Sequence, residues 1–279
     1  MPFVTTEIML KKAQEGGYAV GAFNAENMEM VQAIIAAAEA EKAPVIVQTT
    51  PGTLKYASPA CFAGLVERLA QQATVPVALH LDHGNSFEMA STCAREGYTS
   101  LMIDGSLLPF EGNVTLTKQV VEMANGLPVE AELGTVGGKE DTHAATAQYT
   151  DPAEAEAFVS QTGISSFAVA IGTAHGVYKG EPKLDLNRLS AVRERVSIPL
   201  VLHGTSGVPE DQVRECIRRG ICKVNYATEL RQVFTKAVRQ SLAAQPEAYD
   251  PKKYLADGRS AVQARVQDLI RLLGSNGKA

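Results

Sequence analysis

The sequence predicts a single (β/α)8 barrel, the TIM-barrel architecture, spanning residues 1–279. Short β-rich runs alternate with amphipathic segments of helical length, and the alternation repeats eight times. Such a pattern gives either a closed barrel or a long open sheet. We favour the barrel because eight is its strand number and no Gly-x-Gly-x-x-Gly turn follows the first strand. In addition, the polar residues able to carry chemistry gather at the ends of the expected strands.

The expected strands are rich in Val, Ile and Leu and mostly apolar on both faces, as in a covered parallel sheet. They are Tyr18–Phe23, Pro44–Thr49, Pro76–Leu81, Thr99–Ile103, Pro128–Glu132, Ser166–Ile171, Ile198–Leu202 and Ile221–Asn225. The expected helices between them are Met28–Glu41, Ala60–Gln72, Phe87–Glu96, Asn113–Asn125, Pro152–Thr162, Leu186–Val196 and Pro209–Arg219. Ser58-Pro59 and Asp151-Pro152 are typical helix starts, with a capping side chain before a proline.

Two glycine-containing segments interrupt the alternation, Gly134–Thr150 after strand five and Gly172–Lys183 after strand six. Long loops in a compact barrel are typical of mobile active-site elements. The last segment, Tyr254–Leu273, has the apolar stripe of a helix. We expect this C-terminal extension to cap the barrel or to pack on a partner subunit.

Composition narrows the class of protein. Apolar residues make up 45% and charged residues 20%, an ordinary globular mixture. The net charge of −5 argues against nucleic acid or an anionic membrane as the main partner, but not against a small anionic substrate. No signal peptide or membrane-spanning run is recognisable, so we expect a cytoplasmic protein. Cys61, Cys93, Cys216 and Cys222 form no CxxC pair, which indicates buried free thiols.

Polar side chains end or directly follow six of the expected strands. These are His80, Asp82 and His83 at strand three, Asp104 at four, Glu132 at five, His175 at six, His203 at seven and Asn225 at eight. A barrel brings its strand ends together on one face, where catalytic residues of such barrels lie. Neutral imidazole is a common zinc ligand, and three protein ligands with one open position are typical of catalytic zinc.

Not every histidine fits this interpretation. His80 lies one pleat deeper than Asp82, so we interpret it as a core or supporting residue. His143 lies in the polar loop and is expected to be solvated. His83, His175 and His203 are therefore the stronger candidates for metal ligands. Asp104 and Glu132 could orient these histidines through hydrogen bonds, or could hold a metal themselves.

A phosphate site is predicted independently. His203-Gly204-Thr205-Ser206-Gly207 follows strand seven, and Asn225-Tyr226-Ala227-Thr228 follows strand eight and begins a helix. Barrels often hold phosphate with these two loops and a helix N-terminus.

The motifs HLDHG…SFE, VEAELGTVGG-x-ED, AIGTAHG-x-YKGEPKLD, PLVLHG-x-SGVP and KVN-x-ATEL occur in order along the chain. With these motifs, the sequence closely resembles the class II, zinc-dependent ketose-bisphosphate aldolases over essentially its whole length. VNxATEL and TPGT resemble the tagatose-1,6-bisphosphate branch more closely. HLDHGxSFE and the closing GSNGKA resemble the fructose-1,6-bisphosphate branch.

The resemblance implies roles for individual residues. His83, His175 and His203 would bind Zn²⁺, Asp82 would be the acid–base residue, and Glu140 would move a proton on dihydroxyacetone phosphate. Substrate contacts would come from Asn24, Thr50, Gly176, Gly204, Thr205, Ser206, Asn225, Tyr226, Ala227 and Thr228. A monovalent cation, Na⁺ or K⁺, would lie near the phosphate. Arg259 would reach the neighbouring subunit's site in a homodimer or homotetramer.

The implied reaction is reversible cleavage of a ketose 1,6-bisphosphate to dihydroxyacetone phosphate and glyceraldehyde 3-phosphate. Asp82 would take the proton of the C4 hydroxyl, and zinc would stabilise the resulting enediolate as a Lewis acid. An imine-forming aldolase would instead need a lysine at a strand end. Lys223 lies inside strand eight, before Asn225, so metal chemistry is favoured.

Alternatives stay open at this point. The aldehyde partner could differ, as in a phospho-keto-deoxy-gluconate aldolase. A barrel zinc hydrolase would more typically carry an early HxH pair, whereas His80 and His83 are three apart. A non-catalytic sugar-phosphate-binding barrel would not need Asp82 or Glu140. Tyr226 replaces a small aliphatic residue of the family pattern, and we expect its ring beside the phosphate loop. Thr205 also departs from the Ala or Gly common there.

Overall fold

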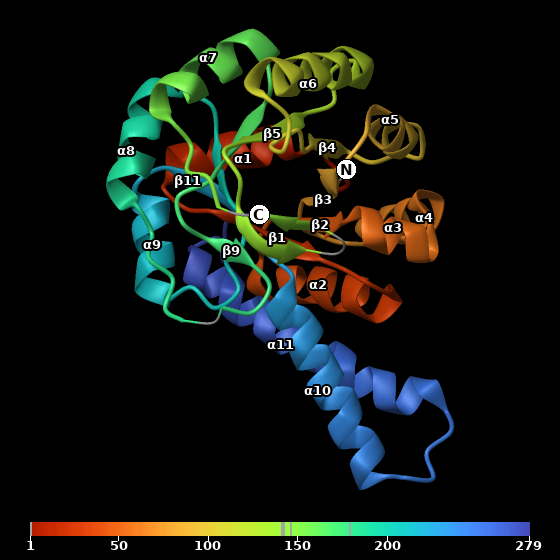
Figure 1. Ribbon diagram of the computed structural model, residues 1–279. Helices are drawn as coiled ribbons and strands as arrows, with labels where there is room; N and C mark the ends of the chain where they lie inside the picture. The colour runs from red at the N-terminus through yellow and green to blue at the C-terminus, as the bar shows by residue number, and fades with distance from the viewer. Residues whose placement is uncertain (1, 141–142, 146, 179) are drawn as a thin grey trace.

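Parallel strands close into an eight-stranded barrel in the computed structural model, which describes residues 2–140, 143–145, 147–178 and 180–279 (Figure 1). The strands in barrel order are β1 (Val20–Asn24), β11 (Ile221–Tyr226), β10 (Leu200–Leu202), β8 (Ser166–Val169), β5 (Val129–Leu133), β4 (Ser100–Ile103), β3 (Val77–Gly84) and β2 (Val45–Thr49). Neighbouring strands of the barrel are parallel throughout, so their carboxyl ends lie on one face. The predicted barrel is confirmed.

Helices surround the barrel. They are α1 (Thr6–Gly16), α2 (Met28–Glu41), α3 (Pro51–Ala57), α4 (Pro59–Ala70), α5 (Phe87–Arg95), α6 (Phe110–Ala124), α7 (Pro152–Thr162), α8 (Leu186–Arg195), α9 (Glu210–Arg218), α10 (Thr228–Ala244) and α11 (Pro251–Leu273). The predicted bounds of α2 and α7 are confirmed to the residue. Asp151 caps α7 by accepting hydrogen bonds from the backbone N–H groups of Ala153 and Glu154. α1 and α3 were not predicted from the sequence.

The two segments that interrupt the alternation follow β5 and β8, as predicted, and they contain short strands that were not predicted. They contain β6 (Gly137–Glu140), β7 (His143–Ala145) and β9 (Ala174–His175), which form a small separate sheet in the order β7-β6-β9. β6 pairs with β9 in parallel, and Gly138 lies opposite His175. The alternating polar composition hid these short strands, because their pairing partners lie far away in sequence.

The C-terminal extension is a helical hairpin. α10 and the first part of α11 project away from the barrel, and α11 then returns to pack beside α2 (Figure 1). Gly258 allows the two helices to approach closely, since a Cβ atom there would lie 2.7 Å from the Phe234 ring. The end of α11 packs on the barrel, where Leu273 accepts a hydrogen bond from the backbone N–H of Ala19. The predicted cap is thus formed by the second half of α11.

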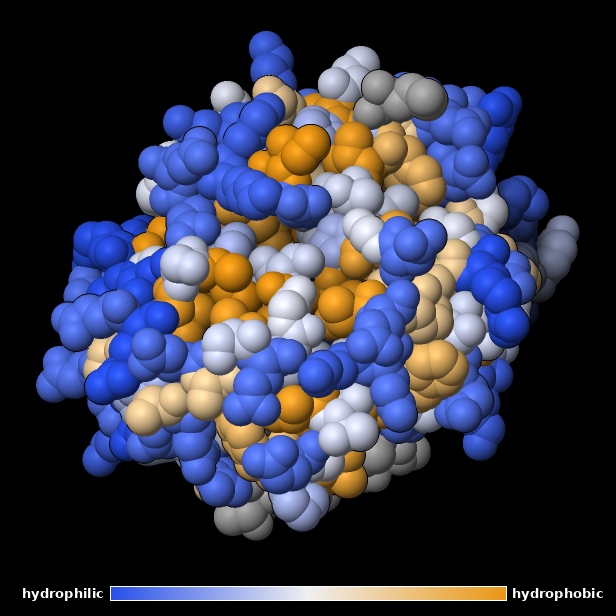
Figure 2. Space-filling model, turned by 90° about the horizontal axis from the view of Figure 1, so that it is seen from above, coloured by the Kyte–Doolittle hydropathy of each residue, from blue (hydrophilic) through white to orange (hydrophobic). Residues whose placement is uncertain are grey.

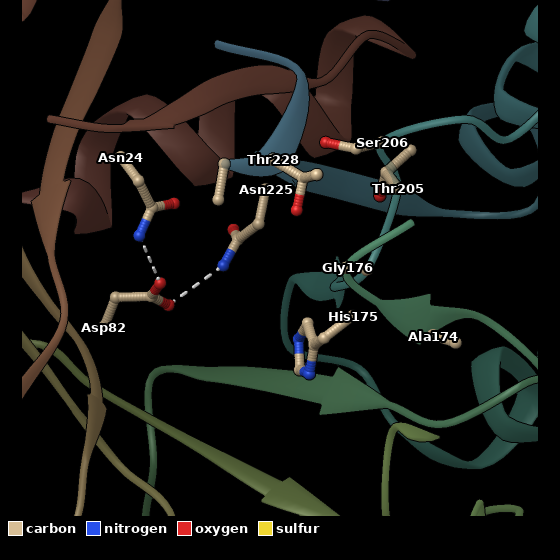
Figure 3. A pocket seen from close by; sticks show the side chains of 11 residues that line it. Asn24, Asp82, Ala174, His175, Gly176, Thr205, Ser206, Asn225 and Thr228 are labelled. Atoms are coloured by element: carbon tan, nitrogen blue, oxygen red, sulfur yellow. Dashed lines mark hydrogen bonds between the residues drawn. The ribbon is translucent and has the colours of Figure 1, made fainter. Parts of the chain in front are cut away.

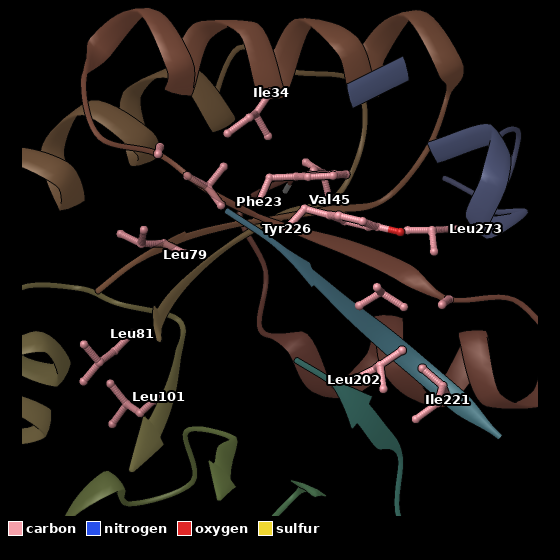
Figure 4. Packing of buried hydrophobic residues seen from close by; sticks show 14 of the residues in the cluster. Phe23, Ile34, Val45, Leu79, Leu81, Leu101, Leu202, Ile221, Tyr226 and Leu273 are labelled. Atoms are coloured by element: carbon pink, nitrogen blue, oxygen red, sulfur yellow. The ribbon is translucent and has the colours of Figure 1, made fainter. Parts of the chain in front are cut away.

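Most of the hydrophobic core lies between the strands and the surrounding helices. Phe23 of β1 and Tyr226 of β11 stack with ring centroids 6.0 Å apart beneath Ile34 of α2 (Figure 4). A second cluster closes the other end of the barrel, where Met9 and Leu10 of α1 pack against the barrel interior. Burying a large apolar side chain contributes about 2 kcal/mol. The cluster beside α1 is apolar, whereas the polar residues that end the strands lie at the opposite, carboxyl end of the barrel.

The thiol prediction is partly confirmed. Cys93, Cys216 and Cys222 are buried and free, whereas Cys61 is free but exposed. Cys61 lies in the first turn of α4, on the face that does not pack on the barrel. Among the described residues, no helix is both long and apolar enough to cross a membrane.

Candidate active site and metal centre

Three histidines from different strand ends converge. Ligand nitrogens of His83, His175 and His203 all lie within 4.8 Å of one another. The ring centroid of His83 is 4.9 Å from that of His175 and 4.7 Å from that of His203. The three imidazoles come from distant parts of the sequence. Together they form a set of nitrogen donors typical of zinc.

A local distortion of β3 aims His83 into this cluster. The β3–β4 register shifts between Leu81 and Gly84, and His83 has a φ of 49°, in the left-handed region. Non-glycine residues rarely adopt this conformation, and it is often found at functional sites. Nδ1 of His83 lies 2.8 Å from Oδ2 of Asp104. That contact fixes the orientation of the His83 ring.

His203 is held between two carboxylates. Its Nε2 lies 2.9 Å from Oε1 of Glu130, and its Nδ1 lies 3.3 Å from Oε2 of Glu132. Nδ1 of His203 and Oε2 of Glu132 are buried without a hydrogen bond to any described residue. Burial alone lowers the pKa of His203, but these carboxylates outweigh it and raise the pKa. A buried nitrogen of increased basicity, facing other imidazoles, fits a cation.

His175 is half-buried on β9, an edge strand of the small sheet, and is placed by the pairing of β9 with β6. Burial and the neighbouring His83 and His203 lower its pKa well below the usual value. The ring is therefore neutral at physiological pH, the protonation state that binds a metal ion.

Asp104 and Glu132 also lie within reach of this centre. Together with His83 they form a second group whose ligand atoms lie within 4.8 Å of one another. Asp104 is also fixed by the backbone N–H of Ser106, which donates to Oδ1 at 3.0 Å. The structure thus places both predicted carboxylates beside the histidines, where each can orient a ligand or supply an oxygen.

Asp82 lies beside the histidines with both carboxylate oxygens occupied. Asn24 Nδ2 donates to Oδ2 at 2.8 Å, and Asn225 Nδ2 donates to Oδ1 at 3.0 Å (Figure 3). Burial alone raises the pKa of Asp82, but His83, His203 and Lys223 outweigh it and lower the pKa. The carboxylate is therefore ionised and able to accept a proton.

A cavity joins Asp82 and His175 to the predicted phosphate loops. Its lining residues are Asn24, Asp82, Ala174, His175, Gly176, Gly204, Thr205, Ser206, Asn225, Ala227 and Thr228. The cavity ends at the first residue of α10, whose N-cap residue makes no side-chain cap hydrogen bond. Backbone N–H groups at a helix start attract anions. The residues of this cavity therefore fit a phosphate group beside the metal centre.

Tyr178 connects two loops of this cavity, a role that the sequence analysis missed. Its hydroxyl accepts a hydrogen bond from the backbone N–H of Ala174 at 2.7 Å and donates one to the carbonyl of Gly204 at 2.8 Å. Gly204 has a φ of 63°, and a Cβ there would lie 2.7 Å from the carbonyl carbon of Ala174. Close packing of the two loops thus needs glycine at this position.

Several predicted residues lie elsewhere. Thr50 is buried and its hydroxyl lies 3.2 Å from that of Thr53, outside the cavity lining. The expectation for the Tyr226 ring is wrong, because it packs into the core beside Phe23 and not beside the phosphate loop. Arg259 lies on α11 and donates to Gln32 of α2. It is not part of this chain's own cavity.

The remaining predictions concern a deep residue and the interrupting loop. His80 is buried with Nδ1 2.6 Å from the Ser100 hydroxyl, outside the histidine cluster, as predicted. Burial and Lys223 lower its pKa to about 3. The side chains of Glu140 and His143 lie outside the described part of the structure, as do residues 141–142.

Glu130 and Lys223 are buried polar residues for which no role in the site was predicted from the sequence. Glu130 has a signal in the sequence, since it alternates with Glu132 in β5 and therefore points to the same face. Lys223 has a similar relation to Asn225 in β11. A charged residue two positions before a polar residue at a strand end is therefore expected to point into the barrel interior.

Comparison with known proteins agrees with this geometry. A family model described as "Fructose-bisphosphate aldolase class-II" matches residues 4–278. A fructose-bisphosphate aldolase of Geobacillus stearothermophilus is 47% identical, with 100% of this chain and 99% of that protein covered.

Solved structures extend the comparison. The crystal structure of the YdjI aldolase from Escherichia coli K12 matches with a TM-score of 0.90 and 39% identity, covering 99% of each chain. A fructose-bisphosphate aldolase from Campylobacter jejuni shares the fold, with a TM-score of 0.85 and 22% identity over 99% of this chain and 97% of its own. The chain therefore belongs to the class II fructose-bisphosphate aldolase family, and it is a lyase.

Proposed function

We propose that the chain reversibly cleaves a ketose 1,6-bisphosphate, of the tagatose or fructose type, to dihydroxyacetone phosphate and glyceraldehyde 3-phosphate. The observation that carries the proposal is the convergence of His83, His175 and His203 beside a cavity that also contains Asp82 and the phosphate loops. Cleavage of a phosphorylated ketose requires a cation, a base and an anion site close together, and this convergence supports the proposal.

The proposed metal is Zn²⁺ held by His83, His175 and His203. The fit rests on the buried Nδ1 of His203 and on the neutral state of His175. When bound, Zn²⁺ supplies a Lewis acid for negative charge that develops at the ketose carbonyl. Asp104 and Glu132 orient the ligands or offer an alternative position for the ion.

Asp82 is the proposed acid–base residue. In cleavage it removes the proton of the C4 hydroxyl, the C3–C4 bond breaks, and the electron pair remains on the three-carbon fragment that becomes dihydroxyacetone phosphate. Asn24 and Asn225 hold the carboxylate in one orientation for this transfer. Glu140, at the end of β6, is the proposed donor of the proton that completes dihydroxyacetone phosphate.

The phosphate of dihydroxyacetone phosphate is proposed to bind Gly176, Gly204, Thr205, Ser206 and Thr228 at the start of α10. Tyr226 and Ala227 lie between Asn225 and Thr228 in the same loop. Because the ring of Tyr226 packs into the core, this residue can offer the phosphate only its main-chain groups. A monovalent cation, Na⁺ or K⁺, near backbone carbonyls would offset the charge of the phosphate. Thr50 remains a proposed substrate contact. Arg259 is the proposed contact of the second phosphate, in the neighbouring subunit's site.

Self-association is proposed together with the role of Arg259. The α10–α11 hairpin projects from the barrel, with Leu242 and Tyr249 exposed on it. The face seen in Figure 2 also carries apolar side chains across its middle, ringed by hydrophilic ones. A second copy of the chain would bury such surface. We expect a homodimer or homotetramer in the cytoplasm, measurable by light scattering after size-exclusion chromatography.

Chelation tests the proposed function. Treatment with a strong chelator is expected to abolish cleavage of the preferred bisphosphate, and added Zn²⁺ to restore it. Full activity in the chelator would contradict the proposal. A panel of fructose-1,6-bisphosphate, tagatose-1,6-bisphosphate and phosphorylated deoxy-keto sugars, compared by kcat/KM, identifies the substrate. Activity confined to the deoxy sugars would instead support a different aldehyde partner.

A further inference from the structure

Beneath the metal centre, Lys223 and Glu130 form a buried ion pair inside the barrel. Nζ of Lys223 lies 3.0 Å from Oε2 and 3.2 Å from Oε1 of Glu130. The side chains are 0% and 1% exposed. The pair bridges β11 and β5, which are separated in the barrel by β10 and β8. A buried ion pair is weak evidence for stability, since an apolar pair of similar size is often as stable. Its position therefore invites a functional explanation.

One end of the pair contacts the metal centre. Oε1 of Glu130, which faces the lysine, also lies 2.9 Å from Nε2 of His203. A carboxylate there keeps the proton of His203 on Nε2, which leaves the lone pair of Nδ1 for a metal. Lys223 neutralises the charge of this carboxylate, so that Glu130 can remain buried beside the imidazole.

The other end of the pair leads to Asp82. Lys223 Nζ donates to Oδ1 of Asn225 at 2.8 Å. An ammonium group only donates, so it fixes the oxygen of the Asn225 amide on its own side. Nδ2 of Asn225 is thereby directed to Oδ1 of Asp82, at 3.0 Å.

The neighbouring amide is fixed in an analogous way. Gln48 Nε2 donates to Oδ1 of Asn24 at 2.7 Å, and Asn24 Nδ2 donates to Oδ2 of Asp82. Each oxygen of Asp82 is thus held by an amide whose orientation is determined by a donor behind it. Lys223 differs from Gln48 because it also contacts Glu130, the carboxylate that supports the proposed metal ligand His203.

We propose that Lys223 is a positioning residue that orients Asp82 through Asn225 and supports His203 through Glu130. The inference rests on the proposed function. Three acceptor oxygens within 3.2 Å account for the three protons of the ammonium group, and the side chain is fully buried. Lys223 is therefore not available as an imine-forming nucleophile. Lys223 thereby fixes the position of the base, Asp82, relative to the metal ligand His203.

Variants separate the two branches. In the double variant Glu130→Gln/Lys223→Met, the glutamine oxygen still accepts from His203 and no charge is left unpaired, whereas the Asn225 amide loses its donor. We expect a folded protein with zinc affinity within about threefold of the original chain, since the support of a ligand is retained. The kcat should fall about 100-fold with little change in KM, as expected for a disoriented base.

Glu130→Gln alone leaves the Lys223 ammonium without a counter-charge near His203. Its zinc affinity, measured by competition with a chromophoric chelator, should fall about tenfold. Lys11→Met, an exposed lysine on α1, is the matched control and should change neither quantity. Thermal unfolding by circular dichroism establishes that each variant is folded.

Two results would overturn the proposal. A folded, zinc-loaded double variant with kcat within threefold of the original chain would make Lys223 a purely structural ion-pair partner. Unchanged zinc affinity in Glu130→Gln would remove the His203 branch. Failure of the proposed function is distinguishable, because the original chain with zinc would then cleave no bisphosphate. A crystal structure of the double variant still decides the Asp82 branch, since Nδ2 of Asn225 should leave hydrogen-bond distance of Asp82.

Discussion

Asp104 holds His83 by a hydrogen bond of 2.8 Å between Oδ2 and Nδ1, and its other oxygen is fixed by the backbone N–H of Ser106. Asp104→Ala removes this support and one possible oxygen ligand. The zinc affinity is expected to fall about 10- to 100-fold. Chelator competition measures it, with Asp268→Ala, an exposed carboxylate on α11, as the control. Equal affinities for the two variants would contradict the assigned role.

Tyr178 is predicted to keep the loops after β8 and β10 together. Tyr178→Phe leaves the N–H of Ala174 and the carbonyl of Gly204 without the bridging hydroxyl. Each of the two lost hydrogen bonds costs about 1 kcal/mol, so kcat/KM is expected to fall about 30-fold, mainly through KM. Steady-state kinetics on the preferred bisphosphate checks this, and an unchanged KM would show that other contacts position the loops.

The hydroxyl of Tyr226 is buried and has no hydrogen bond to the described part of the chain. Tyr226→Phe removes a desolvated polar group while keeping the ring stacked on Phe23. The free energy of unfolding is expected to rise by about 1 kcal/mol. Tyr98→Phe is the matched control, because its hydroxyl lies 2.7 Å from that of Thr49 and its loss should destabilise the protein. Chemical denaturation should show changes in the free energy of unfolding that have opposite signs in the two variants.

Thiol reactivity is expected to divide the cysteines. Burial raises the pKa of Cys93 and Cys216 to about 12 and that of Cys222 to about 11. Because the thiolate is the reactive form, these three remain unreactive thiols up to mildly alkaline pH. The exposed Cys61 should react with a disulfide reagent at pH 8 in a single fast phase. Fast reaction of more than one thiol in the native protein would contradict this assignment.

Phe158 of α7 is central to the packing of helices against β8, with ring centroids 6.1 Å from both Phe110 and Phe167. Phe158→Ala leaves a cavity that the surrounding barrel cannot fill. The free energy of unfolding is expected to fall by about 3–5 kcal/mol. Denaturant titration measures the loss, and a value below 1 kcal/mol would mean that the site collapses around the smaller side chain.

The sequence predicted the barrel well because its strands are apolar on both faces and its helices carry explicit start signals. Asn27 caps α2 and Asp151 caps α7, and both helix bounds follow from these local features. Polar residues at strand ends identified most of the cavity, since a parallel barrel leaves no other place for its carboxyl ends.

What the sequence left undetermined depends on contacts between distant segments. The β6–β9 pairing, the Tyr178 bridge and the Lys223–Glu130 pair each join residues that no local pattern connects. The direction of the Tyr226 ring was missed for a related reason. Side chains of a strand alternate between its faces, and Tyr226, next to Asn225, faces the helices and not the site.

The register of the small sheet gives the loop after β5 a direct influence on the metal centre. Gly138 lies opposite His175, and a side chain at Gly138 would collide with the His175 carbonyl. A change in the position of β6 would therefore move the backbone of His175, a proposed metal ligand. By thermodynamic linkage, a substrate that stabilises one arrangement of this segment changes metal affinity by the same factor that the metal changes substrate affinity. If the proposed function holds, substrate and metal are therefore expected to act as reciprocal effectors.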